Sequence, residues 1–453
     1  MSLFGSNFNI IFHNSLNLFH IIFLMRMGST WKSSYLSKEN QDDSNSLTIP
    51  FVSEKTSTPR QCSFARSVIN GTNLLCGIGL MTMPYAVKEG GFLSLALLLL
   101  FAVICCYTGI LLMRCLQSYP GLDTYPDIGQ AAFGYAGRLG IAIILSLELF
   151  GASVEFLTLV SDNLSALFPN TSMIVAGTEL STHQVFTIAA ALLVLPTVWL
   201  KNLSLLSYIS VGGIFATVIV ALCLFWVGAI DQVGFINPGN KLLDIKNISV
   251  SIGLFGFAFT GHAVFPNVYS SMKDQSKFPL VLYISFAISV IMYTSVGAVG
   301  YLMFGDKIES QFTLNMPKEL YASQIAIWTT VVTPLAKFAL ILLPVASSIE
   351  ELVVPSPRLR CYAMSLFIKT TLVFSSLFVA LSFPYFGSVM ALIGSLMSML
   401  VSLIYPCACY LKLHSGRLST MQITNCILII IVGVISGIIG TYSATSRIFG
   451  DGD

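Results

Sequence analysis

The feature that most constrains the fold of this chain is a series of long apolar runs. From residue 64 onward, eleven runs of about 17 to 25 mostly apolar residues follow one another, separated by polar or Gly/Pro-marked turns. Each run is long enough to cross a bilayer as a helix, which predicts an all-α integral membrane protein of about eleven transmembrane helices. The candidate spans are 64–87, 93–116, 139–160, 185–200, 203–230, 250–272, 279–304, 325–345, 361–381, 386–411 and 423–443.

The composition is typical of an integral membrane protein. The chain is 55% hydrophobic and 10% charged, whereas soluble proteins average about 25% charged residues. Its net charge of +2 creates no field that would attract nucleic acid, so the expected partner is the lipid bilayer. We expect a largely disordered cytosolic tail at 1–62, one transmembrane domain at 63–445 and a short lumenal or extracellular C-terminus at 446–453.

The distribution of basic residues predicts the orientation. The tail and the loops on its side of the membrane hold most of the Lys and Arg residues, which are retained in the cytosol during insertion. The loop expected after the third span has none, and it carries the glycosylation motifs Asn163-Leu-Ser and Asn170-Thr-Ser. The N-terminus is therefore predicted to be cytosolic, and that loop lumenal or extracellular.

Two spans carry the marks of an interrupted helix. In the first span Gly77 and Gly79 lie before Pro84, and in the sixth Gly261 lies before Pro266, five residues away as Gly79 is from Pro84. Spans 1 and 6 each begin a group of five, and because five is odd the second group starts from the opposite side of the membrane. This pattern predicts a 5+5 inverted repeat with broken helices 1 and 6. The alternative is chance spacing, because Gly and Pro are frequent in membrane helices.

The two breaks together predict a binding site. In lipid, the backbone groups freed by a break must meet other protein or line a cavity. The amides that begin the second half of span 1 suit a carboxylate, and the carbonyls that end the first half of span 6 suit an ammonium, which together describe an α-amino acid. For the aromatic residues of this set the alternative is packing or contact with lipid. The candidate substrate-binding residues are Thr72, Asn73, Cys76, Gly77, Ile78, Gly79, Phe255, Phe257, Phe259, Thr260 and Gly261.

Ionisable residues inside the spans are candidates for ion coupling, because charge in lipid is costly. Glu148, Glu155 and Asp162 are spaced by seven along span 3, on one helix face. Lys337 in span 8 can replace a bound cation or exchange a proton with a carboxylate; the alternative is a structural ion pair or a snorkelling side chain. His262 lies in the break of span 6, as a relay or as a hydrogen-bonding residue. The candidate coupling residues are Glu155, His262, Lys337 and Thr333.

Motifs of other function classes are missing from the sequence. It contains no zinc-protease, serine-hydrolase, P-loop or dinucleotide-binding motif, which argues against an enzyme and predicts neither a cofactor nor a metal site. We expect an amino acid transporter that works by alternating access, with a small amino acid and a proton as its partners. The alternatives are a membrane receptor that binds the amino acid with little net flux, or a channel, although no repeated filter motif is visible. The oligomeric state stays open.

Three motifs resemble a known family, the amino acid/auxin permease superfamily, and within it the vacuolar amino acid transporter branch. The string Thr260–Tyr269 and the string Thr333–Phe338, with Ser347–Glu351, look like that branch. The resemblance covers about Ser63 to Ser443. In span 1 the matching residues are Gly71, Asn73, Gly77, Gly79, Pro84 and Tyr85.

The resemblance implies properties beyond those that composition and spacing predict. They are an eleven-helix LeuT-type fold, a mainly neutral amino acid substrate, proton-linked transport and a location in the vacuolar membrane. The alternative location is the plasma membrane. The sequence departs from the family pattern at Met1–Phe23, which looks unlike the polar tail that the family leads us to expect.

Overall fold

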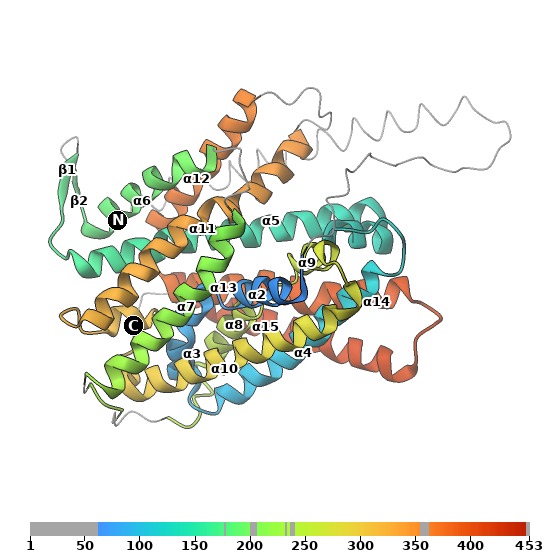
Figure 1. Cartoon of the computed structure of the whole chain (residues 1–453), viewed down its shortest axis with the longest axis horizontal. Helices are drawn as coiled ribbons and strands as arrows, with labels where there is room; N and C mark the ends of the chain where they lie inside the picture. Colours follow the sequence, from blue (N-terminus) through green and yellow to red (C-terminus); the bar gives the residue numbers. More distant parts are fainter. Residues whose placement is uncertain are drawn as a thin grey trace. The chain divides into compact units, whose positions relative to one another are not determined.

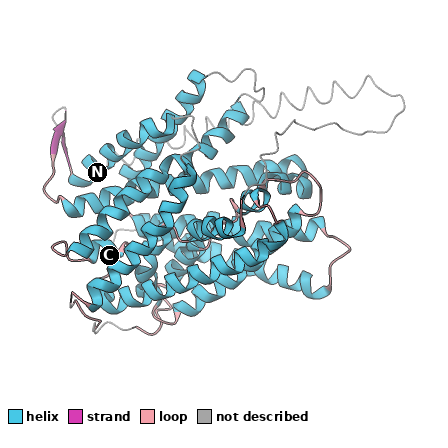
Figure 2. Cartoon of the chain, viewed as in Figure 1, coloured by secondary structure: helices cyan, strands magenta, loops and turns pink. Residues whose placement is uncertain are grey.

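The computed structural model describes residues 62–175, 178–199, 206–231, 233–235, 241–353 and 362–449. The tail expected at 1–62, with Met1–Phe23, therefore lies outside the described residues apart from Cys62. Within the described part the chain consists mainly of helices, and one short antiparallel hairpin lies between α5 and α6 (Figure 2). The hairpin pairs β1 (Met173–Val175) with β2 (Thr178–Leu180).

The predicted count of eleven spans is confirmed. Among the described residues nine helical stretches are long and apolar enough to cross a membrane, and two interrupted segments complete the set. The nine stretches are α4 (Ser94–Leu116), α5 (Tyr125–Leu167), α6 (Thr182–Trp199), α7 (Leu206–Ala229), α10 (Phe278–Phe304), α11 (Tyr321–Val353), α12 (Tyr362–Ser382), the run from α13 (Phe386–Ile393) to α14 (Tyr405–Leu413), and α15 (Thr420–Phe449).

Short 3-10 turns mark the ends and connections of several spans. They are η3 (Gln275–Lys277), η4 (Gly305–Lys307) and η5 (Phe312–Asn315). The last two belong to the connection between α10 and α11. The helix α15 continues to Phe449, into the segment expected to form the C-terminus.

The predicted interruption of spans 1 and 6 is confirmed. Span 1 consists of α2 (Phe64–Leu75), the 3-10 helix η1 (Ile78–Thr82) and α3 (Met83–Gly90). Span 6 consists of α8 (Ile248–Ala258) and α9 (Phe265–Ser271), and α2 and α8 lie near the centre of the bundle in Figure 1. Pro84 and Pro266 each lie in the first turn of the continuing helix, where the missing proline N–H leaves no helical carbonyl unpaired.

Span 3 is longer than predicted. The sequence predicts 139–160, whereas α5 begins at Tyr125 behind a capping box formed by Thr124 and Asp127, and it bends at Gly134, where φ is 68°. Because α5 runs to Leu167, Asn163 lies inside the helix and is buried. The interpretation of Asn163 as part of an exposed glycosylation loop is therefore wrong; Asn170 lies beyond the helix and is exposed.

Span 10 differs from a simple helix. Between α13 and α14 the backbone widens into two π-helical turns, η7 (Gly394–Ser398) and η8 (Leu400–Ile404). Gly394 lies directly against the Gly253 carbonyl of α8, so that a side chain at either glycine would collide with the other helix. These two glycines allow the first half of span 6 to pack tightly on span 10.

The buried apolar side chains form two separate clusters. One cluster draws only on α5, α6, α11 and α12, as illustrated by Phe156 and Phe338. The larger cluster joins the broken spans to α4, α7, α10, α13, α14 and α15, with further residues from α5 and α11. Ile78, in the break of span 1, packs against both clusters. The first break thus lies where the two packing units meet.

Candidate functional site

The break in span 1 exposes backbone carbonyls, and side chains from neighbouring helices meet them. The hydroxyl of Tyr293 on α10 hydrogen-bonds to the Leu75 carbonyl. The hydroxyl of Thr217 on α7 donates to the Cys76 carbonyl at 3.1 Å. An unpaired carbonyl in lipid would cost several kcal/mol, so these donors help to offset the cost of the break.

The amides on the other side of the break remain available. Ile78 and Gly79 occupy the first turn of η1, where no earlier carbonyl of that helix can accept their N–H groups. Gly77, just before them, has no side chain and borders open space, because a Cβ there would have the Leu74 carbonyl oxygen, 3.8 Å away, as its nearest neighbour. This is the positive helix end predicted to receive a carboxylate.

A cavity adjoins these amides. It has a volume of about 50 Å³ and connects, through shared lining residues, with a cavity of about 420 Å³ between α7 and α11. The larger volume falls within the range of small-molecule sites. The residues that line the smaller cavity are Gly77, Ile78, Met81, Phe156, Leu159, Ala216, Thr217, Val220, Thr329, Thr330, Thr333, Pro334 and Lys337.

Lys337 joins the cavity to the first half of span 1. Its ammonium donates a hydrogen bond of 2.9 Å to the side-chain oxygen of Asn73. A Cβ on Gly213 of α7 would touch this oxygen and would lie 2.7 Å from the Lys337 Nζ, so glycine leaves the space for the pair. Thr333, one turn before Lys337, donates to the Thr329 carbonyl at 2.8 Å and lines both cavities.

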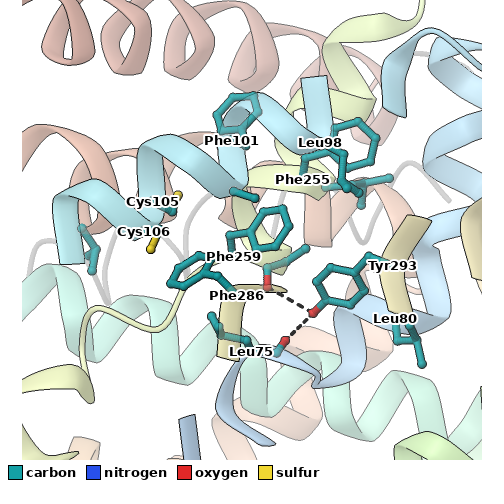
Figure 3. Close-up of a cluster of buried hydrophobic side chains, with 14 of the residues drawn as sticks. Leu75, Leu80, Leu98, Phe101, Cys105, Cys106, Phe255, Phe259, Phe286 and Tyr293 are labelled. Atoms are coloured by element: carbon teal, nitrogen blue, oxygen red, sulfur yellow. Dashed lines mark hydrogen bonds between the residues drawn. The ribbon is translucent and has the colours of Figure 1, made fainter. Parts of the chain in front are cut away.

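The predicted aromatic residues of span 6 form a buried wall rather than part of the cavity lining. Phe255 and Phe259 are fully buried in the larger cluster, and Phe259 stacks on Phe286 with ring centroids 5.8 Å apart (Figure 3). Phe257 is partly buried and packs against the same cluster. Thr260 donates to the Gly256 carbonyl at 2.8 Å, which satisfies one of the carbonyls released by the break.

Gly261 and His262 complete the break in span 6, and both are packed against neighbouring residues. A Cβ on Gly261 would lie 2.8 Å from the Phe265 ring. The His262 Nε2 lies 3.0 Å from the Thr108 hydroxyl and 3.1 Å from the Cys105 carbonyl, both on α4. His262 is fully buried and ties the break to span 2.

The polar face predicted along span 3 meets three different environments. Glu148 accepts a hydrogen bond of 2.8 Å from Ser398 in η7. Asp162 accepts 2.7 Å from Gln311, in the connection between α10 and α11, and pairs with His183 at 3.2 Å. Glu155, between them, is 1% exposed, and one of its carboxyl oxygens has no hydrogen-bond partner in the described part of the chain.

A charged cluster joins the second half of span 1 to the first half of span 6. Arg447 of α15 contacts Glu89 of α3 at 2.6 Å, donates 3.1 Å to the Tyr85 hydroxyl and donates 2.8 Å to Asn247. Asn247 is the residue that precedes the first turn of α8. The Glu89 side chain is only 8% exposed, so it depends on the arginine for its charge balance.

The structure brings together part of the set predicted from sequence. Gly77, Ile78, Thr333 and Lys337 line one cavity, and Asn73 binds Lys337. Cys76 and Gly79 belong to the same break, where Cys76 donates to Ser289 at 3.2 Å. Thr72 is buried nearby, and its hydroxyl has no partner among the described residues.

Several residues at the site were missed from the sequence. Thr329 is one of them, although it is spaced by four from Thr333 and by eight from Lys337 on α11, so their common helix face was an available signal. Tyr293 gave a similar signal, because it is spaced by four from Ser289 and by eight from Ser285 on α10. Thr217 gave none, because its neighbours along α7 are apolar, and its role follows only from the packing of α7 against the break.

Comparisons with known proteins agree with this geometry. Residues 60–446 match the family described as transmembrane amino acid transporter protein. The chain is 56% identical to the amino acid transporter AVT1D of Arabidopsis thaliana, over 86% of this chain and 71% of that protein. It is 50% identical to the transporter AVT1C of the same plant, over 88% of this chain and 72% of that protein. It is 26% identical to the vesicular GABA transporter of Caenorhabditis elegans, over 84% of this chain and 78% of that protein.

The fold is found in a solved structure as well. A crystal structure of the manganese transporter of Eremococcus coleocola superposes with a TM-score of 0.53 at 12% sequence identity, covering 90% of this chain and 93% of that chain. At this identity the likeness concerns the fold alone. It supports the LeuT-type arrangement with broken helices 1 and 6.

The buried charge on Glu89 generates a stability prediction. Replacing Arg447 by Met leaves this carboxylate without its cation, and we expect the free energy of unfolding to fall by about 3 kcal/mol. Lys277→Met is the matched control, since Lys277 pairs with Asp274 at 3.2 Å on an exposed surface, where such pairs contribute less than about 1 kcal/mol. Unfolding in mixed micelles measures both; equal losses would contradict the role of Arg447.

Proposed function

Because the chain belongs to the transmembrane amino acid transporter family, we propose that it is a secondary active transporter of mainly neutral amino acids, coupled to protons and working by alternating access. The observation that carries this proposal is the cavity at the break of span 1, which the Lys337 ammonium lines. Resemblance to the vacuolar branch supports the vacuolar membrane as its location. The distribution of basic residues supports a cytosolic N-terminus.

A zwitterion fits the charges around the two breaks. The amides of Ile78 and Gly79 offer donors to a carboxylate, and the carboxyl-terminal end of α8 offers acceptors to an ammonium. The walls of the smaller cavity are apolar at Phe156, Leu159 and Val220, and Lys337 is the one charged residue that the described part of the chain contributes to its lining. A substrate side chain without charge therefore suits this site best.

Proton coupling has a structural basis in Lys337. Charge inside a span is costly, which makes Lys337 a candidate for proton exchange. The charged form makes the stronger hydrogen bond to Asn73. Loss of the proton would weaken the contact between α11 and the first half of span 1. It would then be easier for α2 to move relative to α11.

The two packing clusters supply the moving parts for alternating access. One cluster consists of buried residues of α5, α6, α11 and α12, and the other holds the broken spans together with a few residues of α5 and α11. The smaller cavity lies at their junction, with Phe156 and Thr330 on one side and Gly77 on the other. Movement of one unit against the other would open the site to one face of the membrane at a time.

The substrate site is tested by Gly77→Leu. Leucine would fill the open space beside the Ile78 and Gly79 amides, and we expect a loss of amino acid uptake of roughly a hundredfold with normal insertion in the membrane. Purified protein in proteoliposomes is offered radiolabelled neutral, acidic and basic amino acids. Wild-type preference for charged substrates, or unchanged uptake by Gly77→Leu, would contradict the site; specific binding without flux would favour a receptor.

Coupling through Lys337 is tested by two neighbouring glycines. Gly213→Ala places a methyl group against the Lys337–Asn73 pair, and we expect the part of uptake stimulated by a proton gradient to fall roughly tenfold. Gly212→Ala is the matched control, because a Cβ there would meet nothing within 4 Å. The ratio of uptake with and without an imposed gradient is compared in proteoliposomes. The same ratio in both variants would refute a coupling role for this contact.

A further inference from the structure

The side chain of Tyr293 lies between the two broken spans. It is fully buried on α10, and its hydroxyl hydrogen-bonds to the Leu75 carbonyl at the end of α2 and to the Ala258 carbonyl, 3.1 Å away, at the end of α8 (Figure 3). Both carbonyls belong to carboxyl-terminal helix ends, which carry partial negative charge. One neutral hydroxyl thus occupies the point at which two negative helix ends converge.

The hydrogen bonds at this point are unequal. A hydroxyl carries a single hydrogen, so Tyr293 can donate to only one of the two carbonyls at a time. The Leu75 carbonyl has a second donor, the Gly77 amide at 2.8 Å. For the Ala258 carbonyl, Tyr293 is the donor that the described residues provide. Among the described residues both carbonyls are therefore paired only while the tyrosine donates to Ala258.

The packing around the ring places the hydroxyl between the two helix ends. A Cβ on Gly79 would lie 3.2 Å from the Ala258 Cα and 3.5 Å from the Tyr293 hydroxyl, so glycine permits the two breaks to approach each other there. The Phe259 ring stands edge-on to the Tyr293 ring, with centroids 5.4 Å apart. The hydroxyl therefore lies within reach of both carbonyls.

We propose that Tyr293 is a specificity-determining residue that recognises the amino group of the substrate. The two carbonyls and the tyrosine oxygen form a set of three acceptors, and a primary ammonium has three N–H donors to match them. Its positive charge also suits two negative helix ends better than the neutral hydroxyl does. On binding, the ammonium serves the carbonyls of Leu75 and Ala258 together and donates its third hydrogen to Tyr293. This inference rests on the proposed function, since it assigns the amino group of the transported amino acid.

The number of N–H groups on the substrate provides the test. N-methylalanine keeps the charge of alanine but has two N–H donors, so the wild-type protein should disfavour it. In Tyr293→Phe only two acceptors remain, and alanine loses a hydrogen bond that N-methylalanine does not fully make. We expect the ratio of KM for N-methylalanine to KM for alanine to fall about tenfold. Uptake of both labelled compounds into proteoliposomes measures the ratio.

Ser289→Ala is the matched control. It removes a buried hydroxyl from the same helix, one turn away, that contacts the Cys76 side chain rather than the two carbonyls. The ratio should stay at the wild-type value in this variant. An equal fall in Ser289→Ala would overturn the proposal, because it would show a general effect of altered packing on α10.

The remaining outcomes are also decisive. If Tyr293→Phe is not recovered as a monodisperse protein, Gly79→Ala replaces it in the test. Its added methyl group lies against Ala258 and the Tyr293 hydroxyl, so the ratio of KM for N-methylalanine to KM for alanine must fall in this variant as well. Wild-type uptake of alanine with an unchanged ratio in the variants overturns the role of Tyr293 and leaves the proposed function standing. Absence of uptake of any amino acid by the wild type contradicts the proposed function itself.

Discussion

The structure depends on a rule of the bilayer: a backbone N–H or C=O in lipid must find a partner within the protein. An unbroken helix satisfies the rule by itself, and the apolar spans of this chain do so along most of their length. Spans 1 and 6 do not, because their first helices end at Leu75 and Ala258, partway through the span. The organisation of the site follows from how these freed groups are paired.

The pairing is asymmetric between the two sides of the break in span 1. The carbonyls are met by Thr217 from α7 and by Tyr293 from α10. The amides of Ile78 and Gly79 are left beside a cavity. Protein donors thus hold the broken helix together, while its positive end stays open to an anionic group. This division is the basis for the carboxylate site that we propose.

The same break connects the two packing units. Lys337 reaches from α11 to Asn73 on α2, and Ile78 contacts both apolar clusters. Under the proposed function, a change in substrate or in proton occupancy at this place would act on the contact between the units. The Arg447 cluster joins the last turn of α3 to the residue before the first turn of α8.

Much of the fold could be predicted from the sequence, because apolar length and Gly/Pro spacing are local properties. The eleven spans and both breaks follow from such signals. Signals of this kind failed where tertiary contacts decide. The burial of Asn163 depends on the extra length of α5, and the π-helical turns of span 10 lie where it packs against Gly253. The site was predicted only in part for the same reason. Glycine clusters identified Gly77 and Gly261, but the sequence could not distinguish the one that borders a cavity from the one that packs on Phe265.

We propose that amino acid movement at the break is linked to a proton on Lys337. The most direct measurement is proton movement into proteoliposomes during amino acid uptake, followed with a pH-sensitive dye in the vesicle lumen, for the wild type and Lys337→Met. We expect proton movement that requires substrate in the wild type, and amino acid exchange without proton movement in the variant. Substrate-dependent proton movement that persists undiminished in Lys337→Met would show that Lys337 does not link the two.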